Sequence, residues 1–152
     1  MRHVSHGMQI NAPRMHVWET ATDCSLLPQW NVSYTKVKDC SGRLDSVGAK
    51  YTAVARILGR EIEGPWEVIE VEPGRKVVTR GTAAGGAVAT ISAVYTDVDG
   101  GTHAQFELDY ELPGGFMTGP LERLVGPSVE RDIQHSGENL KALCEALVPT
   151  RI

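Results

Sequence analysis

Asp132 and Ser136 are two polar residues, four positions apart, in a stretch that otherwise has the pattern of an amphipathic helix. Side chains at this spacing lie on the same face of a helix. If that face closes a cavity, burial would raise the pKa of Asp132 and suit its carboxyl group to proton transfer. The alternatives are that Asp132 reaches solvent or pairs with an arginine, and that Ser136 bonds back to the helix carbonyl of Asp132.

His6 and Tyr110 are the other two candidates for acid/base chemistry. His6 lies on the apolar face of an alternating segment over 3–11, where a histidine is either a hydrogen-bonded core residue or a donor in a pocket. Tyr110 lies on the apolar face of the segment HAQFELDYEL. His3 and His6 lie on opposite faces of a strand and cannot form a metal pair. We therefore predict no metal site and no cofactor.

Three aromatic residues and one glycine are candidates for binding a ligand. Trp30 ends a short helical segment just after a proline, where an amphipathic indole could meet a ligand at the end of a cavity. Trp66 fits a cavity wall and a core equally well, and Phe106 fits plain core packing better. Gly137 inside a helix costs about 1 kcal/mol relative to alanine. Either close packing on a sheet or room for a ligand would explain it.

The stretch from Gly114 to Leu147 predicts a long C-terminal helix. Its firm part should begin at Pro127, because proline fits the first turn of a helix and breaks an interior one. On 100° steps the apolar residues form one stripe. The stripe consists of Val125, Val129, Ile133, Leu140, Leu143, Cys144 and Leu147. Asp132, Ser136 and Gly137 interrupt or border it, so we predict a helix that roofs a cavity.

The chain before this helix has the pattern of an antiparallel sheet. Two short helical segments follow the first strand, and glycine turns separate the later strands. These are expected near 34–40, 50–58, 61–71, 76–82, 88–98 and 102–112. We predict an α+β fold in which a curved seven-stranded sheet wraps around the C-terminal helix. One helix about 10 Å wide cannot otherwise cover seven strands about 4.8 Å apart. The inward face of 50–58 and 88–98 stays open, because both faces carry small or β-branched residues.

Composition indicates one globular domain over residues 1–152 and argues against several classes of protein. The net charge of −4 and the pI of about 5.7 disfavour a nucleic-acid partner, which would require a basic surface. No apolar run approaches the ~18 residues of a membrane span, and the N-terminus lacks the apolar core of a signal peptide. The chain contains no GxSxG, P-loop or GxGxxG motif.

The cysteines are Cys24, Cys40 and Cys144, an odd number without a CxxC pair. This spacing favours free thiols that behave as small hydrophobic residues. Free thiols are typical of reducing compartments, so we predict a cytoplasmic protein.

Several segments, taken in order, resemble one known family. They are INAPRMHVWETATDCSLLPQWN, GPWEVIEVEPGRKVVTRG, GGTHAQFELDYELPGG and LERLVGPSVERDIQHSGENLKAL. Together they cover nearly the whole chain. They resemble the polyketide cyclase/dehydrase-like group of the START-related SRPBCC superfamily, which has the helix-grip fold of the birch-pollen allergen.

The resemblance implies a hydrophobic ligand held between the sheet and the long helix. Cyclases of this superfamily fold a poly-β-keto chain in that cavity and promote aldol closure and dehydration. Only Trp30 and the sheet-facing side of the long helix match general pocket positions. Whether Arg56 matches the cyclases' pocket arginine depends on the inward face of its strand.

We therefore expect a monomer or homodimer that binds a polyketide, aromatic or acyl compound. His6, Tyr110 and Asp132 would be the acid/base residues of a cyclase or dehydratase. The alternative functions are a carrier or sensor without chemistry and, less favoured, a lipid-transfer or stress-associated binding module.

Overall fold

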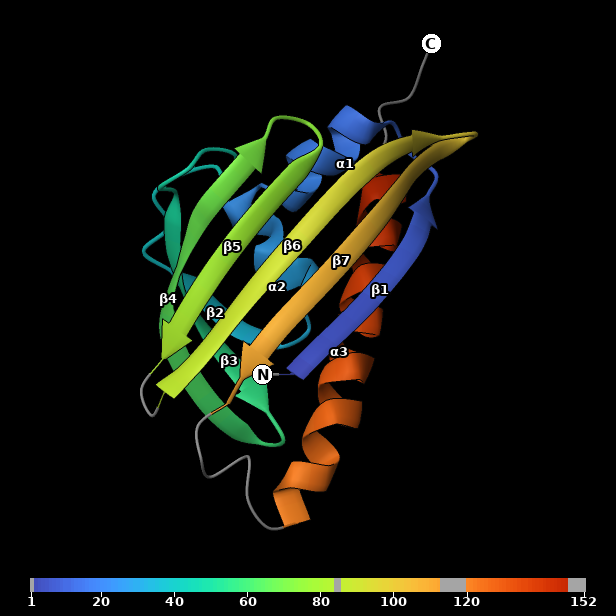
Figure 1. The fold of residues 1–152 in the computed structure, drawn as a ribbon. Coiled ribbons are helices and arrows are strands. Elements are labelled where there is room, and N and C mark those ends of the chain that lie inside the picture. The colour runs from blue at the N-terminus through green and yellow to red at the C-terminus, as the bar shows by residue number, and fades with distance from the viewer. Residues whose placement is uncertain (1, 84–85, 113–119, 148–152) are drawn as a thin grey trace.

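The computed structural model describes residues 2–83, 86–112 and 120–147, and these form one curled antiparallel sheet with helices on its inner side (Figure 1). In chain order the elements are β1 (Arg2–Ile10), α1 (Arg14–Ala21), η1 (Cys24–Leu26), α2 (Leu27–Trp30), β2 (Tyr34–Lys38), β3 (Lys50–Ile57), β4 (Arg60–Glu72), β5 (Lys76–Ala83), β6 (Ala87–Val98), β7 (Gly101–Glu111) and α3 (Pro120–Ala146). The strands follow the order β1-β7-β6-β5-β4-β3-β2. The predicted helix-grip architecture is confirmed.

The sheet curls so that strands from both of its sides meet the long helix. Helix α3 packs mainly on the edge strand β1, and it also contacts β3, which lies near the opposite edge. The register shifts between Val68 and Glu70 in β4, and between Tyr34 and Lys36 in β2. Such irregularities bend a strand and increase its twist, which helps the sheet to close around the helix.

The structure assigns the inward faces of the two strands that the sequence left open. On β3, Tyr51, Ala53, Ala55 and Ile57 point inward. On β6 the inward residues are Ala87, Ala89, Ile91, Ala93 and Tyr95. Alanine occupies many of these positions, and short side chains leave space between the sheet and α3. Arg56 consequently lies on the outer face, where it is exposed and pairs with Glu61.

Helix α3 begins seven residues earlier than predicted, so the expectation of a start at Pro127 is wrong. Pro127 lies inside the helix, and it is Pro120 that occupies the first helical position, where proline is favoured. Val125 and Val129, on either side of Pro127, are both buried against Tyr110 and its neighbours. This burial offsets the hydrogen bond that an interior proline removes. Leu147, predicted for the apolar stripe, is 48% exposed. Residues 114–119 of the predicted helical stretch lie outside the described residues.

The prediction of three free cysteines is also wrong, because Cys24 and Cys40 form a disulfide. They are 16 residues apart in the sequence, and the fold brings η1 beside the segment after β2. Cys144 is free and buried in α3. The cysteine-based argument for a cytoplasmic location therefore loses its basis. None of the described helices combines the length and apolar character that a bilayer span requires.

Reduction of the Cys24–Cys40 disulfide should lower the free energy of unfolding by about 3 kcal/mol, since the cross-link closes a loop of roughly 15 residues in the unfolded chain. Urea denaturation with and without reductant measures the difference. The Cys24→Ser/Cys40→Ser double variant should show no response to reductant. Alkylation of three thiols in unfolded, unreduced protein would contradict the assignment.

Candidate functional site

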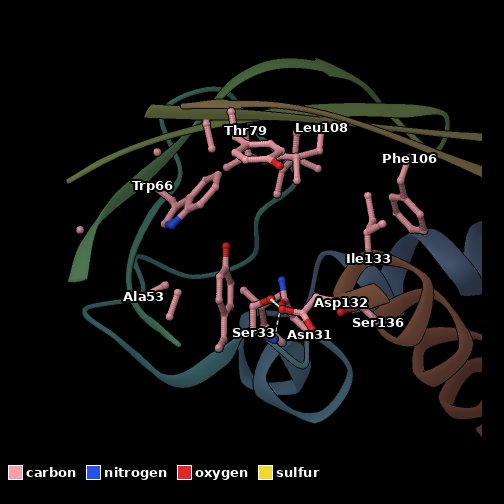
Figure 2. A pocket seen from close by; sticks show the side chains of 18 of the residues that line it. Asn31, Ser33, Ala53, Trp66, Thr79, Phe106, Leu108, Asp132, Ile133 and Ser136 are labelled. Atoms are coloured by element: carbon pink, nitrogen blue, oxygen red, sulfur yellow. Dashed lines mark hydrogen bonds between the residues drawn. The ribbon is translucent and has the colours of Figure 1, made fainter. Parts of the chain in front are cut away.

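A cavity of about 220 Å³ lies between the inner face of the sheet, α2 and α3. Figure 2 shows Trp66, Thr79 and Leu108 facing Asp132, Ser33 and Asn31 across it. The volume exceeds the roughly 150 Å³ of an apolar cavity that takes up benzene. Carbon atoms form most of the wall, so the site suits an apolar molecule.

Three aromatic rings form one wall of the cavity. Tyr51 and Trp66 stack with an interplanar angle of 5° and centroids 6.2 Å apart, and Tyr34 packs against both. Trp66 lies over Gly81 of the next strand, where a Cβ would come within 2.5 Å of the indole. Glycine therefore makes room for the ring. We call Tyr34, Tyr51 and Trp66 the aromatic wall.

The two tyrosines of this wall are absent from the sequence-based candidates. Their hydroxyl groups share a hydrogen bond of 3.0 Å. Burial raises the pKa of Tyr34 and of Tyr51 well above the ordinary value, so both hydroxyls stay neutral. Because the inward face of 50–58 could not be read from the sequence, nothing indicated that Tyr51 faces the cavity.

Asp132 lines the cavity, as its position in the helix predicted. Ser33 and Ser136 line it too, and we call these three residues the polar corner. Its Oδ2 accepts a hydrogen bond of 3.1 Å from the Ser33 hydroxyl. Burial raises the pKa of Asp132, and the Ser33 hydrogen bond and the charges of Arg131 and His135 partly oppose this shift. A half-buried carboxyl group of this kind can exchange a proton with a bound molecule.

Ser136 also lines the cavity and is buried. Its Oγ accepts a hydrogen bond of 3.0 Å from the backbone N–H of Val32. Ser136 therefore fastens the segment between α2 and β2 to α3. This contact places Ser33 beside Asp132, so the serine positions the polar corner as well as contributing to its wall.

Trp30 and Tyr110 line the cavity and carry buried polar atoms without a partner among the described residues. These atoms are the indole Nε1 of Trp30 and the hydroxyl oxygen of Tyr110. Burial raises the pKa of Tyr110, while the charge of Arg2 opposes the shift, so the hydroxyl remains a neutral donor. Both atoms have almost no accessible surface, so it is other parts of the two side chains that border the open space of the cavity.

Phe106 contributes both to the wall and to the core. It is buried, borders the cavity and packs edge-on against Tyr95 at a centroid distance of 6.4 Å. The two alternatives considered for this residue therefore coexist.

His6 and Gly137 lie away from the cavity, in the contact between β1 and α3. A Cβ on Gly137 would approach His6 Cδ2 to 3.0 Å and Met8 Cε still more closely. Neither residue belongs to the cavity wall. Both had been predicted to face a ligand, and this placement corrects that expectation. The inner face of β1 is covered by α3, so no room remains for a ligand there.

Charged side chains are sparse in this site. Among the described residues of the wall, Asp132 and Glu111 are acidic and none is Lys, Arg or His. Arg56 was considered as a match to the pocket arginine of the cyclases, but its side chain points outward. The described part of the chain holds no group of three or more potential metal ligands.

Substitution Gly137→Leu should lower the free energy of unfolding by about 1–3 kcal/mol, because the new side chain overpacks the β1–α3 contact. It should leave the affinity for N-phenyl-1-naphthylamine, a neutral fluorescent dye, unchanged. Urea denaturation and dye titration measure the two effects, with Glu138→Leu on the exposed side of α3 as the control. If the variant lost dye binding while its stability stayed unchanged, Gly137 would belong to the ligand site after all.

Comparison with known proteins agrees with this geometry. The model of a family described as "Polyketide cyclase / dehydrase and lipid transport" matches residues 1–145. The match therefore includes every strand and nearly all of α3. Among curated proteins, none matches the sequence.

Solved structures share the fold at low sequence identity. Protein TTHA0849 from Thermus thermophilus has a TM-score of 0.78 at 20% identity, covering 95% of this chain and 98% of that one. A START superfamily protein from Mycobacterium smegmatis has a TM-score of 0.71 at 16% identity, covering 96% and 99%. DynU16, from the dynemicin biosynthetic locus, has a TM-score of 0.67 at 20% identity, covering 99% of this chain and 49% of that one. The family match confirms the resemblance to the polyketide cyclase/dehydrase-like group, and the solved structures share the predicted fold.

Proposed function

Because the chain belongs to the family of polyketide cyclases, dehydrases and lipid-transport proteins, we propose that its cavity binds a hydrophobic small molecule of the polyketide, aromatic or acyl class. The observation that carries the proposal is the apolar cavity of about 220 Å³ between sheet and helix.

The cavity follows from the residue types on two strands. Ala53, Ala55, Ala89 and Ala93 face the interior where larger residues would fill the space. Protein interiors are otherwise close-packed, with few voids larger than a water molecule. A chain that needed only a stable core would gain stability from larger side chains at these positions. The retained space therefore supports a binding role.

Filling the cavity should abolish binding. Thr79 of β5 points into the space, while Arg80 beside it points outward. Thr79→Phe should weaken the affinity for N-phenyl-1-naphthylamine at least tenfold, because the new ring occupies the ligand volume. Arg80→Phe adds the same ring outside and should have no effect. Fluorescence titration measures both, with circular dichroism to confirm folding. Equal binding by both variants would place the ligand elsewhere.

A second candidate function is acid/base catalysis of polyketide cyclisation and dehydration. The half-buried carboxyl group of Asp132 in the cavity wall favours it. In aldol closure its carboxylate would take a proton from the carbon beside a carbonyl. The new carbon–carbon bond would then form, and the attacked carbonyl oxygen would receive the proton. A carrier would bind the same ligand without this step.

The substitution Asp132→Asn separates the two functions. If Asp132 is the base, turnover of a poly-β-keto thioester should fall by about 10²–10⁴-fold while dye binding is unchanged. Wild-type turnover should also decline as the pH falls through the raised pKa of Asp132, since the base must be ionised. Product analysis by mass spectrometry measures both effects. Undiminished turnover in the variant would assign the reaction to other groups, and no turnover in either protein would favour the carrier.

Stability provides the control for this variant. A raised pKa in the folded state means that the Asp132 carboxyl stabilises the fold most at acidic pH, and that this contribution is lost as the pH rises through the raised pKa. The asparagine side chain of the Asp132→Asn variant does not titrate. As the pH rises from 4 to 7, the free energy of unfolding of this variant should therefore increase relative to that of the wild type. Urea denaturation across this range shows whether a loss of turnover has a structural origin.

A further inference from the structure

The carboxyl group of Asp132 has no ion pair in the described part of the chain. Its Oδ2 accepts a hydrogen bond of 3.1 Å from the Ser33 hydroxyl, and no other described group bonds to it. Arg131 and His135 of the same helix favour its ionised form through their charge alone. On the outer face of the sheet, by contrast, the carboxylate of Glu63 pairs with a lysine at 3.1 Å. The Asp132 carboxyl group can therefore accept a further hydrogen bond from a bound molecule.

A ligand in the cavity can reach this carboxyl group. The Asp132 side chain is half-buried and lines the cavity, and Figure 2 shows it beside Ser33 and across the open space from Trp66. The backbone N–H of Ser33 donates a hydrogen bond of 3.1 Å to Asn31 Oδ1, which fixes the serine that holds Asp132. The acceptor therefore has a fixed position on one side of the cavity.

The other charged residue of the wall is also negative. Besides Asp132, the described wall contains Glu111 and no Lys, Arg or His. The sequence between β7 and α3, PGGFMTG, adds no charged residue. An anionic ligand would lose hydration and meet two carboxyl groups. An ammonium group would instead gain a charge-assisted hydrogen bond at Asp132, and it would keep part of its hydration because that side chain is only half-buried.

The aromatic wall supplies the second contact surface. Tyr51 and Trp66 are stacked there, and Figure 2 shows Trp66 on the side of the cavity opposite Asp132. Aromatic side chains offer a large apolar surface to another ring. A molecule that fits both sides therefore carries an aromatic group at one end and a basic nitrogen at the other.

Building on the binding role proposed above, we infer that the cavity selects an arylalkylamine, an aromatic compound with an amino group on a short alkyl chain. Its protonated nitrogen donates a hydrogen bond to Asp132, and its ring packs against the aromatic wall. Asp132 determines the specificity in this arrangement, and Ser33 positions it. The inference rests on the binding role and does not require catalysis by Asp132.

A set of naphthalenes of matched shape tests the inference by isothermal titration calorimetry at pH 7.5, where an alkylamine is protonated as lysine is. The set consists of 2-(2-naphthyl)ethylamine, 2-(2-naphthyl)ethanol, 2-propylnaphthalene and 2-naphthylacetate. The amine should bind about tenfold or more tightly than each of the others, as expected for a hydrogen bond to a charged group. An alcohol or propyl compound that equals the amine would overturn recognition of the charge. An acetate that equals it would overturn the selection against anions.

Two variants of α3 test the role of Asp132. Asp132→Asn keeps the shape of the side chain and removes its charge, so it should weaken amine binding about tenfold and leave 2-propylnaphthalene binding unaffected. Glu130→Gln removes one negative charge from an exposed position outside the cavity wall and should change neither affinity. Equal loss of both ligands in Asp132→Asn would show a packing effect and overturn the assignment. Equal loss of the amine in both variants would assign the preference to the net charge of the protein instead of Asp132.

N-Phenyl-1-naphthylamine distinguishes failure of this inference from failure of the binding role. If the dye binds and the naphthylethylamine does not, the inference is wrong while the cavity still binds ligands. If neither binds, the proposed function fails as well.

Discussion

The close contact between α3 and β1 at Gly137 determines where the rest of the site can lie. A residue without a side chain allows the helix to rest directly on Met8 and His6 at one edge of the sheet. The helix axis is therefore displaced toward that edge, and the remaining strands must curl to enclose it. Asp132 and Ser136, about a quarter turn or more from Gly137, then face the open side instead of the sheet. The cavity is the space that this one-sided packing leaves.

The walls of the cavity are rigid although its interior is empty. The aromatic wall is held by ring stacking and by the close approach of Trp66 to Gly81, and the polar corner is held by the hydrogen bond from Val32 to Ser136. These contacts keep the aromatic wall and the carboxyl group of Asp132 in place before a ligand arrives. Preformed polar groups lose little freedom on binding, which favours both affinity and any proton transfer at Asp132.

Much of the fold could be predicted because it follows from periodicity. Alternation assigned the inward face of 102–112, and the spacing of four residues placed Asp132 and Ser136 together. The sequence does not show how much of an inward face a helix covers, so His6 and Gly137 were assigned to the cavity instead of the β1–α3 contact. Tyr51 was missed because both faces of its strand carry small or β-branched residues. The disulfide could not be inferred from spacing, because the proximity of Cys24 to Cys40 arises only when β2 joins the sheet edge.

The alanines on β3 and β6 give this fold a simple route to new specificity. Their Cβ atoms face the cavity, whereas the hydrogen bonds that set strand register involve only the backbone. A change at Ala55 or Ala89 to valine or leucine would alter ligand volume while the strand pairing and outer charges stay the same. Evolution can therefore change which molecule fits, by two or three carbon atoms at a time, without altering the strand pairing. Such changes can produce a family in which one fold carries varied activities.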